Sequence, residues 1–175
     1  MSAARRILVT GCSGGGKSTL VAGMGRRGWA TVSEPGRRIV RSATGPDDPR
    51  LPWNDAAAFA RAALGLARHD WLLARGATLF DRGVIDAVLA LRRAGAATEA
   101  DAALLERFRY DDTVYLAPPW PELFETDAER RHDRAAAEAE YADLAEAIPN
   151  LGYRLVTLPR LPKEERVDWL AAALS

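Results

Sequence analysis

The amino-acid sequence predicts an α/β fold in which one parallel sheet of about five strands lies between two layers of helices, a three-layer α/β/α architecture. Two observations predict this fold. Short apolar segments alternate along the chain with longer segments of helical periodicity, and a glycine-rich segment connects the first apolar segment to the first helical one. Strands separated by helices pair in parallel through right-handed crossovers. A length of 175 residues suits one domain, so residues 1–175 are expected to form a single domain.

The individual elements follow from the apolar pattern. Strands are predicted at residues 6–10, 29–33, 77–80, 113–116 and 154–158. Helices are predicted after Ser18, at about 55–75, 84–93, 99–108 and 128–147, and from Pro162 onward. In the second of these helices apolar residues recur every four positions, which predicts a buried stripe of Phe59, Ala63, Ala67 and Trp71. In the last helix the predicted buried face consists of Val167, Leu170, Ala171 and Leu174.

The glycine-rich segment reads Gly11-Cys12-Ser13-Gly14-Gly15-Gly16-Lys17-Ser18, the pattern G-x-x-x-x-G-K-S between a strand and a helix. Glycines allow backbone N–H groups to surround anionic oxygens, the helix N-terminus adds partial positive charge, and Lys17 reaches the outer phosphates. Ser18 is expected to bind Mg²⁺ through its hydroxyl. This setting disfavours a chance glycine-rich turn. We therefore expect ATP or another nucleoside triphosphate to be held by Gly11, Ser13, Gly14, Gly15, Gly16, Lys17, Ser18 and Thr19.

Composition limits the remaining possibilities. The chain carries 24 basic and 24 acidic side chains, so its net charge gives no sign of nucleic-acid binding. Its apolar runs are too short for a membrane span and its N-terminus lacks a signal-type apolar region, which predicts a cytoplasmic enzyme. The single cysteine, Cys12, is interpreted as a small loop residue. With only His69 and His132 present, a histidine metal site is not expected.

The residues after each strand are candidate site residues, because ligands of such sheets bind beyond the carboxyl ends of the strands. Asp81 ends the third strand, where a phosphate-loop enzyme places the carboxylate that holds Mg²⁺ directly or through water. The alternative for Asp81 is a cap of the following helix. Arg82 is expected either to clamp a phosphate or to pair with a neighbouring carboxylate.

Glu34 follows the second strand and precedes Pro35. Proline holds the residue before it extended, so Glu34 is expected to project from the strand tip instead of entering a helix. A carboxylate in that position can accept the proton of a substrate hydroxyl as the hydroxyl attacks the γ-phosphate. The alternative is a surface glutamate that pairs with Arg37 or Arg38.

The segment after the fourth strand is predicted to be a lid at residues 118–135. Prolines 118, 119 and 121 end the strand, and the densest charge cluster of the chain follows at residues 129–134. Arg130 and Arg134 share a helix face, as do Arg131 and Arg134, and lid arginines of this kind stabilise the charge on a transferring phosphate. The alternative is a solvated helix.

Two further groups of residues lie on the expected acceptor side. Arg37, Arg38 and Arg41 either line the acceptor pocket or remain solvated, and residues 46–53 form an irregular loop in which specificity would lie. Trp53 and Trp71 are candidates to stack on a planar substrate, although the position of Trp71 on the apolar stripe favours the core.

The ordered series of motifs resembles the P-loop nucleoside and nucleotide kinase-like group. In particular it is similar to bacterial AAA_28-type ATPase/kinase domains such as the ribosylnicotinamide kinase domain of the NAD-biosynthesis regulator. The resemblance covers nearly the whole chain and rests on the phosphate-binding loop, on Glu34-Pro35, on Asp81-Arg82-Gly83, and on segments 115–121, 127–131 and 152–156. By resemblance to deoxynucleoside kinases, Glu34 takes the role of base and Arg82 that of a phosphate contact. The third-strand motif lacks their usual serine or tyrosine, so the resemblance supports phosphoryl transfer more firmly than any acceptor.

These observations together predict an ATP-dependent small-molecule kinase that uses Mg²⁺. The predicted catalytic residues are Lys17, Glu34, Asp81, Arg82, Arg130 and Arg134, with Ser18 and Asp81 at the metal. The expected partner is a small-molecule acceptor, nucleoside-like or another metabolite, with no nucleic acid and no membrane. A regulatory module that binds ATP and hydrolyses it slowly, and an ATPase that acts on nucleic acid, are the alternatives. The acceptor, the choice between ATP and GTP, and the oligomeric state are left open.

Overall fold

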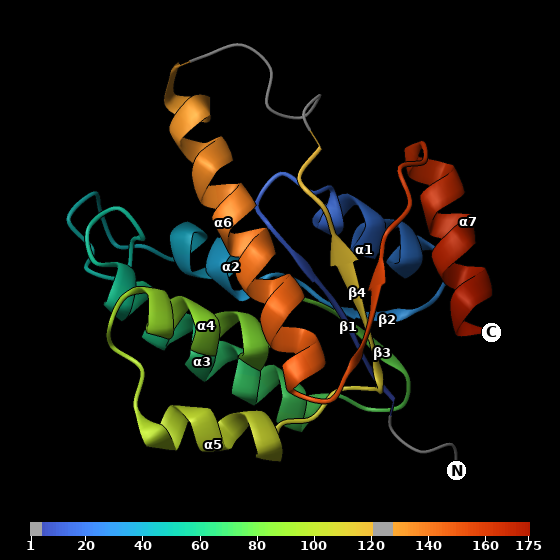
Figure 1. The fold of residues 1–175 in the computed structure, drawn as a ribbon, viewed down its shortest axis with the longest axis horizontal. Coiled ribbons are helices and arrows are strands. Elements are labelled where there is room, and N and C mark those ends of the chain that lie inside the picture. Colours follow the sequence, from blue (N-terminus) through green and yellow to red (C-terminus); the bar gives the residue numbers. More distant parts are fainter. Residues whose placement is uncertain (1–4, 121–127) are drawn as a thin grey trace.

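The fold is a parallel sheet covered by helices on both faces (Figure 1). A computed structural model describes residues 5–120 and 128–175, the side chains of 128–133 excepted. The five strands lie in the order β2-β3-β1-β4-β5 and every neighbouring pair is parallel, which confirms the predicted architecture. Their bounds are Arg6–Gly11 for β1, Ala30–Val32 for β2, Thr78–Asp81 for β3, Thr113–Ala117 for β4 and Arg154–Thr157 for β5.

The described helices include all those predicted and one further helix. They are α1 (Lys17–Arg26), α2 (Pro35–Arg41), α3 (Ala56–Leu73), α4 (Val84–Arg93), α5 (Glu99–Arg107), α6 (Ala128–Asn150) and α7 (Lys163–Leu174). The additional helix is α2. It has only 7 residues, of which Pro35 and Ile39 are buried, so its apolar repeat is too short to indicate a helix.

Two apolar cores lie on opposite faces of the sheet. Alternate residues of β1 enter different cores, because successive side chains of a strand point to opposite faces: Leu8 packs in one, and Ile7 and Val9 pack in the other. The first core contains residues of α3, α4, α5 and α6, and the second contains residues of α1 and α7. Figure 1 shows α7 next to α1 on one side of the sheet and α3, α4 and α5 together on the other.

The predicted stripe of α3 is only partly correct. The fully buried residues are Ala60, Leu64 and Ala67, whereas Phe59 is half-buried. The interpretation of Trp71 as a core residue is confirmed, because its Nε1 donates to the Arg109 carbonyl at 2.8 Å and its ring meets Phe108 edge-on. In α7 the prediction is confirmed, since Val167, Leu170 and Leu174 are buried and Ala171 packs against the same core.

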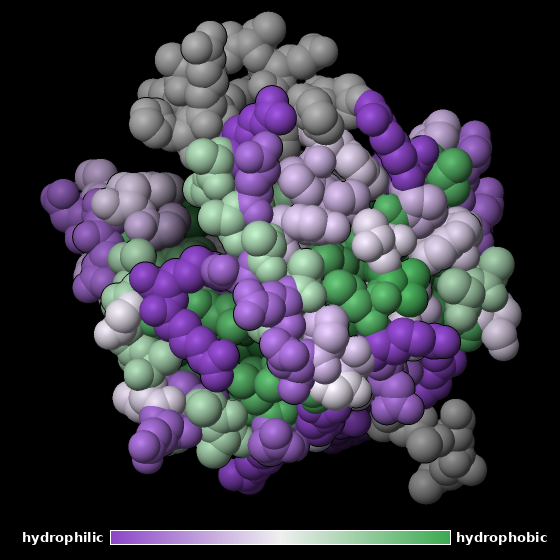
Figure 2. Space-filling view, in the orientation of Figure 1, coloured by the Kyte–Doolittle hydropathy of each residue, from purple (hydrophilic) through white to green (hydrophobic). Residues whose placement is uncertain are grey.

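Hydrophilic residues cover most of the face shown in Figure 2, and hydrophobic residues gather between α6 and α7. Of the helices that the structure describes, none combines the length and apolar character that a membrane span requires.

Candidate active site

The carboxyl ends of β1, β2 and β3 bring the phosphate-binding loop, Glu34 and Asp81 to one edge of the sheet. β3 lies between β2 and β1, and Asp81 pairs in register with Val9, two residues before the loop begins at Gly11. The sheet order therefore unites three segments that are separated by up to about seventy positions in the sequence, as parallel strands do at their carboxyl edge.

The phosphate-binding loop depends on glycine at two kinds of position. Gly14 and Gly16 have φ angles of 76° and 71°, a left-handed conformation that side chains disfavour, and Gly16 is the N-cap of α1. Gly11 also approaches β4 closely, because a Cβ placed on it would lie 2.3 Å from the Ala117 carbonyl oxygen. The loop thus leads into the N-terminus of α1, a position where backbone N–H groups can bind an anion.

Lys17 is buried at the start of α1, and its Nζ donates to the Cys12 carbonyl at 2.5 Å. Burial, followed by the nearby charge of Arg82, lowers the pKa of Lys17 to about 8. Burial raises the pKa of the Cys12 thiol, and Cys12 is fully buried. The interpretation of Cys12 as a small loop residue therefore agrees with its surroundings.

Asp81 lies at the end of β3 and accepts a hydrogen bond from the Ser18 hydroxyl at 2.6 Å. Asp81 is 1% exposed, its Oδ1 has no hydrogen-bond partner, and burial raises the pKa of its carboxyl group. The alternative that Asp81 caps α4 is wrong, because Gly83 is the N-cap of that helix and its N–H donates to Asp86 at 2.8 Å.

The pair of Ser18 and Asp81 fits a Mg²⁺ ion in its chemistry. A hydroxyl and a carboxylate are hard oxygen ligands, and the buried Asp81 Oδ1 has an unsatisfied acceptor. Within the described part of the chain no group of three or more His, Cys, Asp and Glu side chains is placed to hold a metal ion. A site of this composition suits Mg²⁺, which is held by one or two protein oxygens together with nucleotide phosphates.

Glu34 stays outside a helix, as the sequence predicts, and it stands at the entrance to the unpredicted helix α2 with Pro35 at the first helical position. Its backbone is non-helical, and its side chain makes no capping hydrogen bond. The carboxylate pairs with Arg37 at 3.2 Å, and its Oε1 lies 3.3 Å from Arg82 Nε. Arg38 does not pair with Glu34, because it binds Asp70 at 2.5 Å.

Arg82 is buried among carboxylates. Its Nη1 donates to Glu140 Oε1 of α6 at 2.5 Å and lies 3.5 Å from Asp86 Oδ1, while its Nη2 donates to Glu140 Oε2 at 3.3 Å. Its Nε has no hydrogen-bond partner, although it lies near Glu34. Burial opposes the charge, but Glu140, Asp86 and Glu34 together raise the pKa of Arg82. Arg82 therefore stays a cation at the centre of this cluster.

Asp86, in the first turn of α4, is the second carboxylate beside Arg82. It accepts hydrogen bonds from the Thr10 hydroxyl and, at 2.8 Å, from the Gly83 backbone N–H. Burial raises the pKa of Asp86, while Arg82 and the Thr10 hydroxyl act to lower it. Sequence reasoning missed Asp86 and Glu140. Asp86 lies four residues after Arg82, a spacing that could have indicated their contact, whereas only the packing of α4 beside α6 brings Glu140 to Arg82.

A cleft of about 340 Å³ opens between these charged groups and α3. Its described lining residues are Ser13, Glu34, Pro35, Gly36, Pro52, Phe59, Ala60, Ala63, Arg82, Gly83, Asp86, Ala87, Ala90, Arg93 and Glu140. The phosphate-binding loop and Glu34 thus face the same cavity. A smaller cavity beside Ser18 and Asp81 is lined by Arg37, Arg38 and Arg41. Trp53 is 68% exposed and does not line the cleft.

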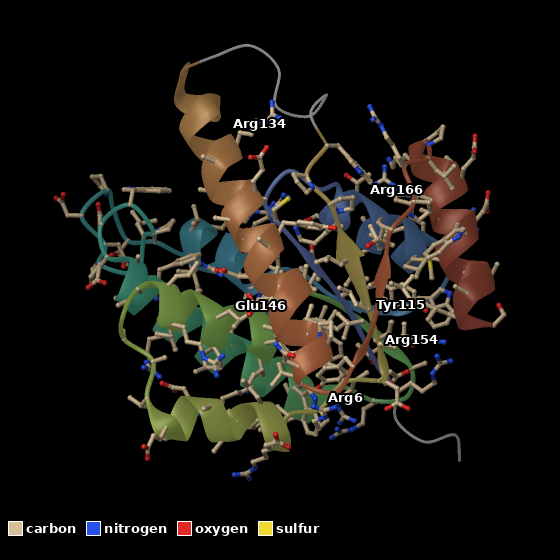
Figure 3. All side chains as sticks on the ribbon, viewed as in Figure 1. Arg6, Tyr115, Arg134, Glu146, Arg154 and Arg166 are labelled. Atoms are coloured by element: carbon tan, nitrogen blue, oxygen red, sulfur yellow. The ribbon has the colours of Figure 1, made fainter. Side chains whose placement is uncertain are left out.

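Part of the predicted lid lies outside the described residues. This part consists of residues 121–127 and the side chains of Arg130, Arg131 and His132. Arg134 is described: it lies on the upper part of α6 (Figure 3) and its Nε binds Glu138 at 2.8 Å on the exposed surface. In this arrangement Arg134 contacts a glutamate of its own helix.

An arginine that sequence reasoning missed lies against the phosphate-binding loop. Arg166 of α7 stacks on the Trp120 ring at 3.8 Å and its Nη2 donates to the Leu161 carbonyl (Figure 3 labels Arg166). A Cβ placed on Gly16 would lie 2.7 Å from Arg166 Nη1. The run Glu164-Glu165-Arg166 carries no signal for this contact, which arises only because α7 packs beside α1.

Comparison with known proteins agrees with this fold. A family model described as AAA domain, AAA_28, matches residues 6–166. Deoxyadenosine kinase from M. mycoides with bound dATP superimposes with a TM-score of 0.65 at 13% identity, covering 97% of this chain and 98% of that chain. The same kinase with dCMP and a flexible dCDP gives a TM-score of 0.61 at 14% identity, over 96% and 97%.

Shikimate kinase from Acinetobacter baumannii in complex with shikimate superimposes with a TM-score of 0.64 at 8% identity, covering 98% of this chain and 93% of that chain. No curated protein sequence matches the chain significantly. The structural matches confirm the predicted kinase-like P-loop fold.

Proposed function

This chain belongs to the AAA_28 family of AAA domains, and we propose that it is an ATP-dependent small-molecule kinase that transfers a γ-phosphoryl group to an acceptor hydroxyl. One observation carries the proposal: Ser13 of the phosphate-binding loop and the carboxylate of Glu34 line the same cleft. A triphosphate on the loop and a hydroxyl in the cleft would then meet beside a base.

The donor half of the proposed site is the loop from Gly11 to Thr19. Its N–H groups and the N-terminus of α1 would bind the phosphates, and the Lys17 ammonium would lie near their outer oxygens. The anionic phosphates would stabilise the charged form of Lys17, whose pKa is lowered by burial. Ser18 and Asp81 would hold Mg²⁺, which when bound neutralises charge on the phosphates.

The acceptor half centres on Glu34. In the proposed step the acceptor oxygen forms a bond to the γ-phosphorus while the bond from that phosphorus to the β,γ-bridging oxygen breaks, which releases ADP. The hydroxyl proton passes to the Glu34 carboxylate. The side chain of Glu34 is partly buried at the cleft wall, and the backbone of Glu34 is non-helical. Its carboxylate can therefore reach a bound hydroxyl.

Arg82 is the proposed cation beside the transferring group. Glu140 and Asp86 fix its Nη1, and its Nε has no hydrogen-bond partner. A guanidinium fixed in this way can stabilise negative charge on phosphate oxygens without reorganising. Arg130 and Arg134 are proposed to add positive charge from the lid, which for Arg134 requires release from Glu138.

Incubation of the protein with Mg·ATP and a pool of small hydroxy compounds tests this function. The proposal expects a new phosphate ester and a stoichiometric amount of ADP, both measured by ³¹P NMR. Slow release of inorganic phosphate with no ester, together with ATP-dependent protection from proteolysis, would instead support a regulatory module that signals through ATP binding.

A further inference from the structure

The floor of the cleft is apolar. Its described residues away from the charged wall are Pro52, Phe59, Ala60, Ala63, Ala87 and Ala90. None of these side chains offers a hydrogen-bond donor or acceptor. At about 340 Å³ the cleft is also small, at the lower end of the range for small-molecule sites.

The charged wall of the cleft is already neutralised by its own members. Arg82 pairs with Glu140, Asp86 and Glu34. Arg93 lies 3.7 Å from Glu140 and 3.2 Å from Asp143. Both guanidinium groups among the described lining residues therefore have carboxylate partners, and the lining contains three carboxylates against these two cations.

Two acceptor classes are disfavoured by this lining. A nucleobase bound on the apolar floor would leave its ring nitrogens and exocyclic groups without hydrogen-bond partners. Burying polar groups without such partners costs free energy of binding. An acidic acceptor would meet carboxylates in excess and would have to displace Glu140 from an arginine. An uncharged acceptor with an apolar body avoids both costs.

Phe59 places an aromatic ring beside the proposed base. The Phe59 Cζ atom would lie 2.9 Å from a Cβ on Gly36, and Glu34 Oε1 would lie 3.5 Å from the same point. Gly36 thus leaves room for the ring tip next to the carboxylate. The loop that contributes Pro52 to the lining is held by Asp48, which accepts from Arg50 Nη2 at 2.7 Å and from the Thr44 N–H at 3.1 Å.

On the basis of the proposed function, we infer that the acceptor is an uncharged hydroxy compound whose body is an apolar ring or chain that packs on Phe59, Ala63 and Ala90. Its hydroxyl faces Glu34. The new bond joins the acceptor oxygen to the γ-phosphorus, the β,γ-bridging oxygen leaves with ADP, and the proton moves to Glu34.

Matched acceptors test the inferred class in the wild-type protein. The probes are 1,4-benzenedimethanol, its near-isostere 4-(hydroxymethyl)benzoate, and the nucleosides deoxyadenosine and deoxycytidine, each with Mg·ATP. The expected result is a kcat/KM for the neutral diol at least about tenfold above those for the carboxylate and the nucleosides. An equal or higher kcat/KM for the carboxylate or a nucleoside overturns the inferred class and leaves the kinase function standing. Absence of transfer to all four probes, with ATP bound, overturns the inferred class, whereas the kinase function is contradicted only when the pool of hydroxy compounds also yields no ester.

Two substitutions of Phe59 give a second readout. Phe59→Leu keeps an apolar surface and is expected to change KM for the diol by less than about threefold, whereas Phe59→Gln introduces an amide and is expected to raise it about tenfold or more. Both variants should keep the wild-type Kd for ATP, which reports that the fold is intact. Equal KM values in the two variants would remove Phe59 from the acceptor site.

Discussion

Arg82 at the end of β3 and Glu140 in the middle of α6, 58 residues apart, form a two-point ion pair with N–O distances of 2.5 and 3.3 Å. The pair ties the strand that carries Asp81 to α6, the helix whose first residues belong to the predicted lid. Arg82 also has a φ of 65°, a strained value for a residue with a side chain. We interpret the strained backbone as the means by which the guanidinium is turned into the carboxylate cluster.

Replacing Arg82 is expected to destabilise the protein strongly. Arg82→Ala leaves Glu140, Asp86 and Glu34 without their shared cation, and the loss of one partner from a buried ion pair costs about 3–5 kcal/mol in the free energy of unfolding. Urea denaturation measures this. The matched control is Arg134→Ala, whose exposed pair with Glu138 should contribute less than about 1 kcal/mol. Similar losses in the two variants would show that the Arg82 cluster adds no special stability.

A helix glycine offers a test of the packing between α1 and α7. A Cβ on Gly23 would lie 2.5 Å from Val167 Cγ2, so Gly23→Ala is expected to lower the free energy of unfolding by about 1–3 kcal/mol, although alanine favours helices. Gly65 in α3 has no atom within 4 Å of such a Cβ. Gly65→Ala should therefore stabilise the protein by about 0.5–1 kcal/mol. If Gly23→Ala instead raised the free energy of unfolding, the described packing of α1 against α7 would be contradicted.

Asp101 predicts a pH dependence of stability. Hydrogen bonds from Arg61 and from Thr98 lower the pKa of Asp101 to about 2, so its stabilising effect is complete above about pH 4 and is lost as the pH falls toward 2. Asp101→Asn should therefore cost about 1 kcal/mol near neutral pH and progressively less as the pH falls through 2, as measured by denaturant unfolding across this range. As a control, Asp168→Asn removes an exposed partner of Arg27 and should show no such trend. A constant difference at all pH values would refute the role of the Asp101 carboxylate.

Lys17 provides a test of the donor site. Lys17→Ala removes the buried ammonium at the start of α1 and is expected to reduce turnover by a factor on the order of 10²–10³ or more. The only other lysine of the chain, Lys163, is exposed, and Lys163→Ala should keep wild-type turnover. Steady-state release of ADP measures both. Wild-type turnover in Lys17→Ala would exclude the loop as the donor site.

Much of the fold could be predicted from the sequence, because it depends on patterns between residues that are close together in the chain. Alternation of apolar strands with helices gave the sheet, and the position of Pro35 correctly indicated that Glu34 stays outside its helix. The interior of the site could not be predicted in the same way. Glu140 and Arg166 reach the site through packing between distant helices, and no spacing in the sequence reports such contacts. Asp86 differs, because it lies four residues after Arg82 and that spacing does indicate their contact. The α3 stripe was misplaced because Phe59 faces the cleft instead of the core.

The most direct test of the account is the effect of Glu34→Gln on phosphoryl transfer and on ATP binding. An amide keeps the shape of the side chain but cannot accept the hydroxyl proton, so kcat for acceptor phosphorylation should fall by about 10²–10⁴-fold. The Kd for Mg·ATP should stay within about threefold of wild type, and Glu165→Gln, at an exposed position of α7, should change neither quantity. Wild-type kcat in Glu34→Gln, measured with the same acceptor, would contradict the assignment of Glu34 as the base.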